Sequence, residues 1–195
     1  RQTVQELAKG QQELWAAIAE LTERIKQLEQ SLQRLLEWQI VLEELIKPMR
    51  DRFAELVGWR LQSRYAEAPY AFFGRCMKRV KRVDLSEIED DVRRLLDPTE
   101  VYDFFRVDLV LRGRPLSRPE EEVYVVLEVS AEIDTDDVVR ASRRASVLRK
   151  AGYRTLAAVG GERIKDIVRD QARNLRVVVT LDGSIEGWDE AIEAL

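Results

Sequence analysis

Histidine is absent from the sequence, and Cys76 is its only cysteine. A single cysteine excludes an intramolecular disulfide and every metal site built from a cysteine cluster. The lack of histidine excludes imidazole ligands for zinc and catalysis that uses an imidazole as general base. A catalytic metal would therefore need carboxylate and carbonyl oxygens, the ligands that Mg²⁺ and Mn²⁺ prefer.

Long apolar runs and an overall charge excess are also missing. No stretch has the length and apolarity of a transmembrane helix, and no signal-peptide pattern is apparent, so we expect a cytoplasmic protein without a membrane partner. The net charge of -4 gives no overall signal for nucleic acid, because duplex-binding domains carry a basic excess or a basic stripe. With 45% apolar and 35% charged residues, the chain is expected to fold.

The first quarter of the chain repeats apolar residues with a strict period of seven. Seven consecutive heptads predict a coiled coil, because a surface helix of a globular domain carries a wider stripe and departs from this period. We expect residues 1–49 to form a coiled-coil helix that oligomerises the protein. The a and d positions, in chain order, are Val4, Leu7, Gln11, Leu14, Ile18, Leu21, Ile25, Leu28, Leu32, Leu35, Gln39, Leu42, Ile46 and Met49.

The number of helices in this coil stays open between two and more. Isoleucine at a with leucine at d in the middle section favours a parallel dimer, and the buried glutamines at two a positions would fix its register. A groove for a partner helix is the alternative to self-association. Against a simple dimer, large apolar residues widen the stripe at e and g, namely Trp15, Leu36, Trp38 and Leu45.

Pro48 predicts a kink or a restart of the long helix, because its ring crowds the preceding turn. We therefore place a domain boundary there and expect residues 50–195 to form the second domain. Residues 53–77 continue a helical pattern. A cluster of cations follows, which we interpret as the solvated end of that helix, with phosphate binding as the alternative: Arg75, Lys78, Arg79, Lys81 and Arg82.

Helical and strand patterns alternate through the rest of the chain, which predicts a mixed α/β domain. Asp97 and Glu100 form a capping box around Pro98, the start of a short helix. In the helix that begins near residue 134, Asp136 precedes Arg140 by four residues, the spacing of a salt bridge. Helices are expected at 86–96, from 98, at 134–150, at 160–174 and around Trp188, and strands at 104–112, 123–130, 155–159 and 176–181.

Two acidic residues lie on strands that are expected to be neighbours. Asp108 lies on the polar face of an alternating strand, whereas Glu128 ends a run that is apolar on both faces, as a central strand is. Glu128 and Ser130 point to the same face, since side chains alternate along a strand. A carboxylate at the end of a buried strand needs a partner, either a metal or an arginine such as Arg140 or Arg143.

The order of these features resembles the PD-(D/E)XK nuclease superfamily, in which a helix precedes a strand with Asp, a strand with Glu-x-Lys, a helix and another strand. The likeness covers about residues 53–159. A closer resemblance, to an uncharacterised bacterial group with an N-terminal coiled coil, lies in the runs DLVLRG at 108–113, LEVS at 127–130 and DVVRASRRA at 137–145. The resemblance implies a restriction-endonuclease-like fold: a mixed central sheet flanked by helices, preceded by the coiled coil.

The resemblance also implies a site for Mg²⁺ or Mn²⁺. Asp108, Glu128 and the carbonyl of Val129 would hold the cation, which would polarise a phosphodiester and lower the pKa of a bound water. Two positions depart from the superfamily's pattern. Ser130 stands where a lysine would offset developing negative charge, and Gln62 stands where relatives often place a metal-binding glutamate.

The resemblance further implies that Arg140 or Arg144 reaches this site from the following helix, since the basic residue of the motif occurs at shifted positions in this superfamily. Arginine stays protonated, so it can stabilise negative charge but cannot act as a base. Two functions follow: a divalent-metal-dependent nucleic-acid phosphodiesterase, or a catalytically inactive nuclease-fold protein that binds or scaffolds. The expected partners are other copies of the chain, through the coiled coil, and nucleic acid, through the nuclease-like domain.

Overall fold

The computed structural model describes residues 2–181 and 183–195, with side chains from residue 9 onward except at positions 51, 54, 55 and 182. The chain divides into two compact units, residues 1–52 and 53–195. The elements are α1 (Gln2–Glu67), α2 (Pro69–Phe73), β1 (Met77–Arg82), the 3-10 helix η1 (Leu85–Glu87), α3 (Glu89–Leu95), α4 (Pro98–Phe104), β2 (Leu109–Pro115), β3 (Val123–Ile133), α5 (Thr135–Lys150), β4 (Thr155–Ile164), α6 (Asp166–Asn174), β5 (Val177–Leu181), β6 (Ser184–Glu186) and α7 (Trp188–Glu193).

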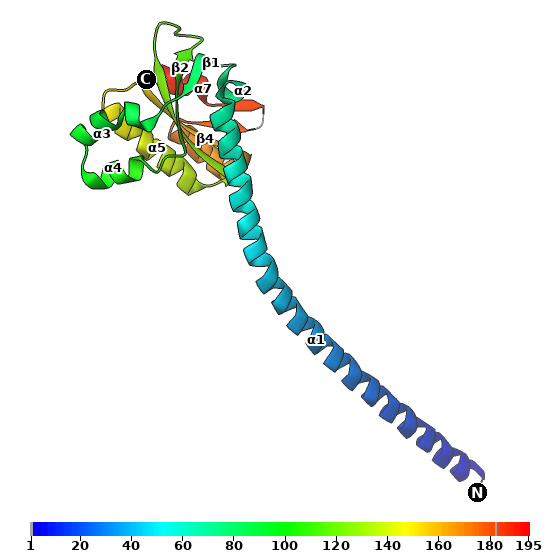
Figure 1. The fold of residues 1–195 in the computed structure, drawn as a ribbon. Coiled ribbons are helices and arrows are strands. Elements are labelled where there is room, and N and C mark those ends of the chain that lie inside the picture. The colour runs from blue at the N-terminus through cyan, green and yellow to red at the C-terminus, as the bar shows by residue number, and fades with distance from the viewer. Residues whose placement is uncertain (1, 182) are drawn as a thin grey trace. The chain divides into compact units, whose positions relative to one another are not determined.

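The N-terminal helix is longer than the sequence pattern indicated. Helix α1 contains Pro48 in its interior and continues to Glu67 (Figure 1). Of the two alternatives at Pro48, a kink or a restart of the helix, the restart is therefore wrong. An interior proline lowers the stability of a helix by about 3 kcal/mol. A long helix can tolerate that loss when good helix formers flank the proline. Among the described residues, no helix has both the length and the apolarity needed to cross a membrane.

The heptad stripe of α1 is exposed in the single chain. Leu28 is 69% exposed and Met49 is 70% exposed, and the other described a and d side chains are exposed as well. Val4 and Leu7, which begin the predicted heptads, lie outside the described side chains. A continuous apolar stripe of this length is the surface that a coiled-coil partner would cover.

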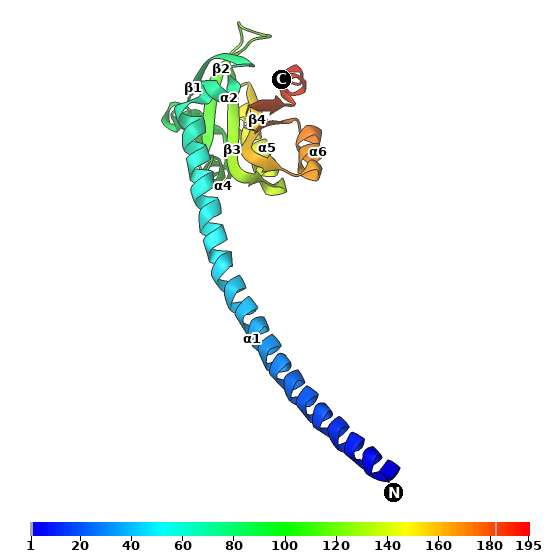
Figure 2. The ribbon, with the colours of Figure 1, turned by 90° about the vertical axis from the view of Figure 1, so that its right-hand side faces the viewer.

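The second unit is built on a six-stranded sheet in the order β1-β2-β3-β4-β5-β6. Strands β1, β2 and β3 pair antiparallel, β3, β4 and β5 pair parallel, and β6 is antiparallel to β5. Helix α5 connects the parallel strands β3 and β4 and packs against both of them (Figures 1 and 2). The predicted mixed α/β class, with its parallel crossover through this helix, is confirmed.

The sheet buries an apolar core on each face. On one face, Val110 and Val126 pack with apolar residues of α3, α4, α5 and α6. On the other face, Leu111 and Leu127 pack with the end of α1, with α2 and with α7. Because both faces of β3 are covered, its side chains are apolar on both sides, as expected for a central strand.

The basic cluster lies on a strand, so its assignment to a helix end is wrong. Strand β1 carries four of these five cations, and Arg75 lies just before it. The helical pattern predicted to run to residue 77 is divided between α1, which ends at Glu67, and α2, which ends at Phe73. The error has a physical source. Met77 and Val80 are both buried although they are three residues apart, because the β1·β2 register shifts between Lys78 and Lys81. A strand with such a bulge has the apolar spacing of a helix.

Two other predicted boundaries are wrong. Residues 104–108 precede β2, and Asp108 lies immediately before this strand rather than within it. Gly160 and Gly161 continue β4 instead of opening a helix. A Cβ atom on Gly160 would lie 2.8 Å from the ring of Tyr65, and one on Gly161 would lie 2.5 Å from the carbonyl oxygen of Ser130. These glycines therefore allow close packing inside the sheet rather than a turn.

Helix α5 (Thr135–Lys150) closely matches the helix predicted at 134–150. The side chain of Asp134 accepts from the amide of Asp137, and the side chain of Asp137 accepts from the amide of Asp134, which closes a capping box. Gly152 follows the helix with a φ of 93°. The apolar stripe of this helix is fully buried against the sheet, at Val138, Ala141, Ala145 and Leu148.

Candidate functional site

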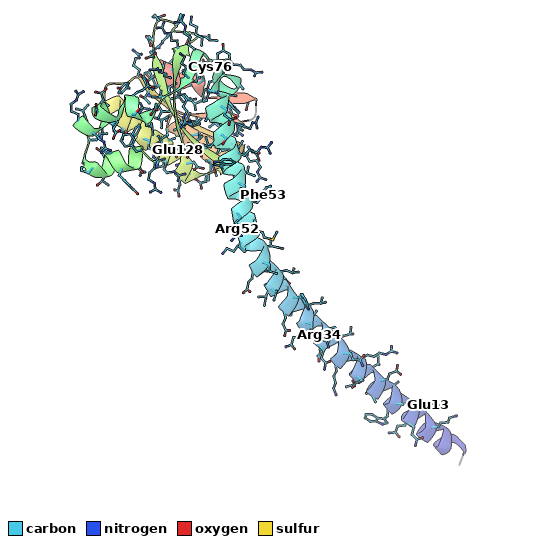
Figure 3. All side chains as sticks on the ribbon, in the orientation of Figure 1. Glu13, Arg34, Arg52, Phe53, Cys76 and Glu128 are labelled. Atoms are coloured by element: carbon cyan, nitrogen blue, oxygen red, sulfur yellow. The ribbon has the colours of Figure 1, made fainter. Side chains whose placement is uncertain are left out.

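Glu128 lies on β3, on the face that α5 covers, and is 3% exposed. Arg144, on the facing side of α5, is 4% exposed. Its Nη1 atom lies 2.7 Å from each of the two carboxylate oxygens of Glu128. Figure 3 marks Glu128 within the second unit. The partner that this buried carboxylate needs is therefore a guanidinium group, which occupies the position between its two oxygens.

Asp108 approaches the same strand from the start of β2. Its Oδ2 atom accepts a hydrogen bond of 2.7 Å from the amide of Val129. The Asp108 carboxylate thus extends the β2·β3 ladder, whose last backbone pair joins Leu109 to Leu127. Burial raises the pKa of Asp108, while the Val129 amide and the charges of Arg144 and Arg140 lower it.

Arg140 lies at the open side of this cluster. Its Nε atom is 3.6 Å from Glu128, and its Nη2 atom forms a closer ion pair with Asp137. The expected pairing with Asp136 is therefore wrong, because the three-residue spacing to Asp137 places that carboxylate toward the sheet. Asp137 is itself 5% exposed. Its carboxylate accepts from the amide of Asp134 in the helix cap and pairs with Arg140.

A fourth carboxylate, Asp103 on α4, completes the arginine network. Both oxygens of Asp103 accept from Arg143, at 2.9 Å and 2.8 Å, and Arg144 approaches Asp103 at 3.4 Å. Arg143, proposed from the sequence as a partner of Glu128, therefore pairs with Asp103 instead. Arg144 bridges Glu128 to Asp103, which ties β3, α5 and α4 together.

The two positions that depart from the nuclease pattern have backbone partners. The side-chain amide of Gln62 donates to the carbonyl oxygen of Asp108 at 3.3 Å. The hydroxyl of Ser130 donates to the carbonyl oxygen of Glu132 at 2.9 Å. Ser130 lines the same cavity as Glu128, whereas Gln62 does not. Gln62 therefore holds the backbone at Asp108, just before β2, and does not line the cavity.

The cluster opens into a strongly polar cavity of about 440 Å³. Six residues expected from the sequence meet at this cluster, and the cavity adds three that the sequence reasoning missed: Asp103, Arg106 and Asp137. Asp103 lies on α4 and Arg106 in the turn between α4 and β2, and neither residue belongs to a motif. Only the fold brings them near Glu128. The nine lining residues are Asp103, Arg106, Asp108, Glu128, Val129, Ser130, Asp137, Arg140 and Arg144.

This donor set fits a divalent cation poorly. Arg144 stands where a cation chelated by Glu128 would stand, and Asp108 gives one oxygen to a backbone amide. Three arginines line the cavity beside its four carboxylates, so little negative charge is left to attract a cation. Among the side chains that the structure describes, no group of three or more Asp, Glu, Cys or His residues is placed to hold a metal ion.

The buried Glu128 should make the free energy of unfolding depend on pH. Burial raises the pKa of Glu128 to about 7; the hydrogen bond from Arg144 opposes this rise and the Asp108 charge adds to it. The folded protein then holds a proton that the unfolded chain releases, so the free energy of unfolding should fall as pH rises from about 4.5 to 7. At 1.36 kcal/mol per pKa unit, the expected loss is about 3 kcal/mol.

Chemical denaturation of the wild type and of Glu128→Gln at pH 5 and pH 8 measures this effect. The glutamine keeps a hydrogen-bond acceptor for Arg144 and cannot titrate. The wild type should therefore lose more stability than the variant between the two pH values. Equal losses in both proteins would contradict a raised pKa at Glu128.

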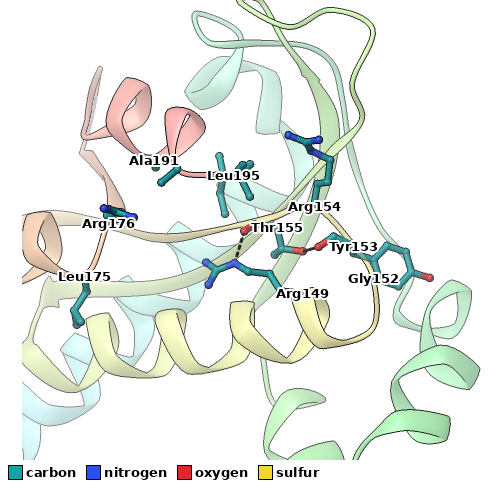
Figure 4. A pocket seen from close by; sticks show the side chains of 11 residues that line it. Arg149, Gly152, Tyr153, Arg154, Thr155, Leu175, Arg176, Ala191 and Leu195 are labelled. Carbon is teal, nitrogen blue, oxygen red and sulfur yellow. Dashed lines mark hydrogen bonds between the residues drawn. The ribbon is translucent and has the colours of Figure 1, made fainter.

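A second cavity of about 440 Å³ lies at the amino ends of β4 and β5 (Figure 4). Its lining includes Arg149, Arg154 and Arg176. Arg149 donates to the carbonyl oxygen of Thr155 at 2.8 Å, and Arg154 pairs with Glu121 at 2.9 Å. Ligands of open α/β sheets bind at the carboxyl ends of parallel strands. This cavity is at the opposite ends, so the Glu128 cluster is the stronger candidate.

No protein-family model, curated protein or solved structure matches this chain. A functional proposal therefore depends on the residues and geometry of the chain itself.

Proposed function

We propose that this chain is an oligomeric binding or scaffolding protein, assembled through its coiled coil, whose α/β domain is nuclease-like but catalytically inactive. The position of Arg144 between the two carboxylate oxygens of Glu128 carries the proposal. A guanidinium there neutralises the carboxylate that a metal-dependent nuclease would use as a ligand. The arginine also connects β3 to α5 and α4, which is a structural role.

A restriction-endonuclease-like topology is part of the proposal. Support for it comes from the antiparallel strands β1, β2 and β3, followed by α5 and the parallel strand β4. Asp108 and Glu128 lie side by side at neighbouring strands, in the order that the nuclease resemblance implies. Ser130 lacks the charge of the lysine in that pattern, so the electrostatic support for a developing oxyanion is weaker.

The second candidate is an active phosphodiesterase that depends on Mg²⁺ or Mn²⁺. One observation favours it: Asp108 and Glu128 line the same open cavity. A cation would have to displace Arg144 from Glu128 before both carboxylates could serve as ligands. Breaking that buried ion pair is expected to make metal binding weak.

A cleavage assay separates the two candidates. The full chain is incubated with plasmid and with single-stranded DNA, in Mg²⁺ and in Mn²⁺, beside Asp108→Asn and Glu128→Gln. Asparagine can still accept from the Val129 amide, and glutamine can still accept from Arg144, so both variants should fold. We expect no cleavage above the level of the variants.

Titration calorimetry with Mn²⁺ gives an independent readout. The wild type and Glu128→Gln should give the same small heats, because Arg144 already occupies Glu128. Cleavage by the wild type that both variants lose, together with Mn²⁺ heats that Glu128→Gln abolishes, would establish the phosphodiesterase and overturn the inactive assignment.

A further inference from the structure

The antiparallel pair β1·β2 presents cations on one face of the sheet. Lys78 pairs directly with Arg114, and Lys81 pairs directly with Arg112. Residues that oppose each other in an antiparallel pair point to the same side, and so do residues two apart on a regular strand. All four side chains therefore share one face, which we call the basic β1·β2 face.

A bulge in β1 produces this arrangement. Arg79 and Val80 stand opposite the single residue Gly113, and Arg79 has a φ of 57° in the left-handed region. In a regular strand, Lys78 and Lys81 would point to opposite faces, because they are three residues apart. The extra residue brings both lysines to the side of the two arginines, at the expense of backbone strain at Arg79.

The charges of this face are incompletely balanced within the chain. Glu87 lies 3.2 Å from Arg112, and the charge of Glu122 also acts on this arginine. In the part of the chain that the structure describes, Lys78, Lys81 and Arg114 form no ion pair. Like charges directly opposite each other on neighbouring strands are destabilising, so an external anion would be favoured here.

Protection of the sheet edge explains only part of the pattern. Lysines and bulges on an edge strand prevent pairing with other chains, and β1 is the edge strand here. That purpose accounts for Lys78 and Lys81. It does not account for Arg112 and Arg114, which lie on the interior strand β2, where edge pairing cannot occur.

We propose that the basic β1·β2 face binds the phosphate backbone of nucleic acid. Arg112 and Arg114 are about 7 Å apart along their strand, since each residue advances the strand by about 3.4 Å. Adjacent phosphates of one DNA strand lie farther apart than their axial rise of about 3.4 Å, because the backbone winds around the helix, so two arginines at this spacing can contact neighbouring phosphates. An acidic peptide strand added to the edge fits less well, because the bulge interrupts the regular row of backbone groups on β1.

The proposal is independent of the Glu128 cluster. The basic β1·β2 face contains none of the residues that line the cavity beside Glu128. Binding at this face would provide a scaffolding domain with a partner and requires no catalysis. The cleavage assay on the Asp108 and Glu128 variants and the binding assay below can therefore fail separately.

Fluorescence anisotropy of the full chain with a short labelled DNA duplex, over a series of salt concentrations, tests the proposal. Four phosphate contacts predict a slope of log K against log salt of about -3.6 for one face. The Lys78→Ser/Lys81→Ser variant should reduce the magnitude of that slope by about two and weaken binding about tenfold or more. Lys78→Arg/Lys81→Arg should bind as the wild type does.

Arg163→Ser/Arg173→Ser is the matched control, because it removes two exposed cations elsewhere in the same unit. It should retain wild-type affinity and slope. Equal weakening by the two serine pairs would assign binding to overall charge and overturn the proposal. A wild type that binds no duplex would also overturn the proposal, as would a wild type that binds vesicles containing phosphatidylserine but no DNA. The Lys78→Ser/Lys81→Ser variant should melt no lower than the wild type, because it removes like-charge repulsion.

Discussion

Replacement of Arg144 by leucine should lower the free energy of unfolding by about 3–5 kcal/mol at pH 8. The change leaves the Glu128 carboxylate buried on β3 without its guanidinium partner, and an unpaired buried charge is strongly destabilising. The loss should be smaller at pH 5, because an unpaired Glu128 would then take up a proton. Urea denaturation monitored by circular dichroism at both pH values measures the difference.

Two further variants separate the ion pair from general disruption of α5. Arg143→Leu changes the neighbouring arginine, whose side chain is 56% exposed and pairs with Asp103, so its effect should stay below about 1 kcal/mol. Glu128→Leu/Arg144→Leu removes both charges and the Nε group of Arg144, which is buried without a hydrogen-bond partner among the described residues. This double variant should recover most of the lost stability. A double variant as unstable as Arg144→Leu would show that packing of the arginine, not charge pairing, stabilises the site.

Introduction of glutamate at two d positions of the coil, in Leu28→Glu/Leu35→Glu, should dissociate the oligomer. Each change would place like charges together in the predicted apolar interface, at a cost of several kcal/mol. Because each 1.4 kcal/mol is a factor of ten, the dissociation constant should rise about 1000-fold or more. Light scattering at micromolar concentration should then give the mass of one chain, while the wild type gives two or more.

The matched control adds the same two charges to the outside of the coil. Gln27 and Gln30 lie at c and f positions and are exposed, so Gln27→Glu/Gln30→Glu should leave the oligomer mass unchanged. A wild type that scatters as a single chain would contradict self-association through the heptads. If Leu28→Glu/Leu35→Glu kept the wild-type mass, another surface would have to form the interface.

Local patterns predicted much of the fold. The heptads predicted the long helix, the helical pattern of residues 134–150 predicted α5, and the doubly apolar run predicted β3 as a central strand. These features depend on residues close in sequence, whose periodicity directly reflects the geometry of a helix or a strand. The boundary errors at β1 and β4 arose where a bulge or a close approach between elements altered that periodicity.

The candidate site was predicted only in part. Asp108 and Glu128 were identified from their strand patterns and Arg140 and Arg144 from the nuclease resemblance, but the sequence left Glu128 open between a metal and an arginine. The choice of Arg144, with Arg143 assigned to Asp103, depends on the rotation of α5 against the sheet and on the position of α4. Such contacts join residues distant in sequence, so no local period encodes them.

The sequence by itself determined the mixed α/β class, the heptad stripe, and the restriction of any metal site to oxygen ligands, because each follows from composition or from a local period. Tertiary structure alone decided that a guanidinium sits between the oxygens of Glu128, and that a bulge gathers Lys78, Lys81, Arg112 and Arg114 on one face. Both outcomes depend on the register and packing between elements, where free energy is set by burial and charge pairing across the fold.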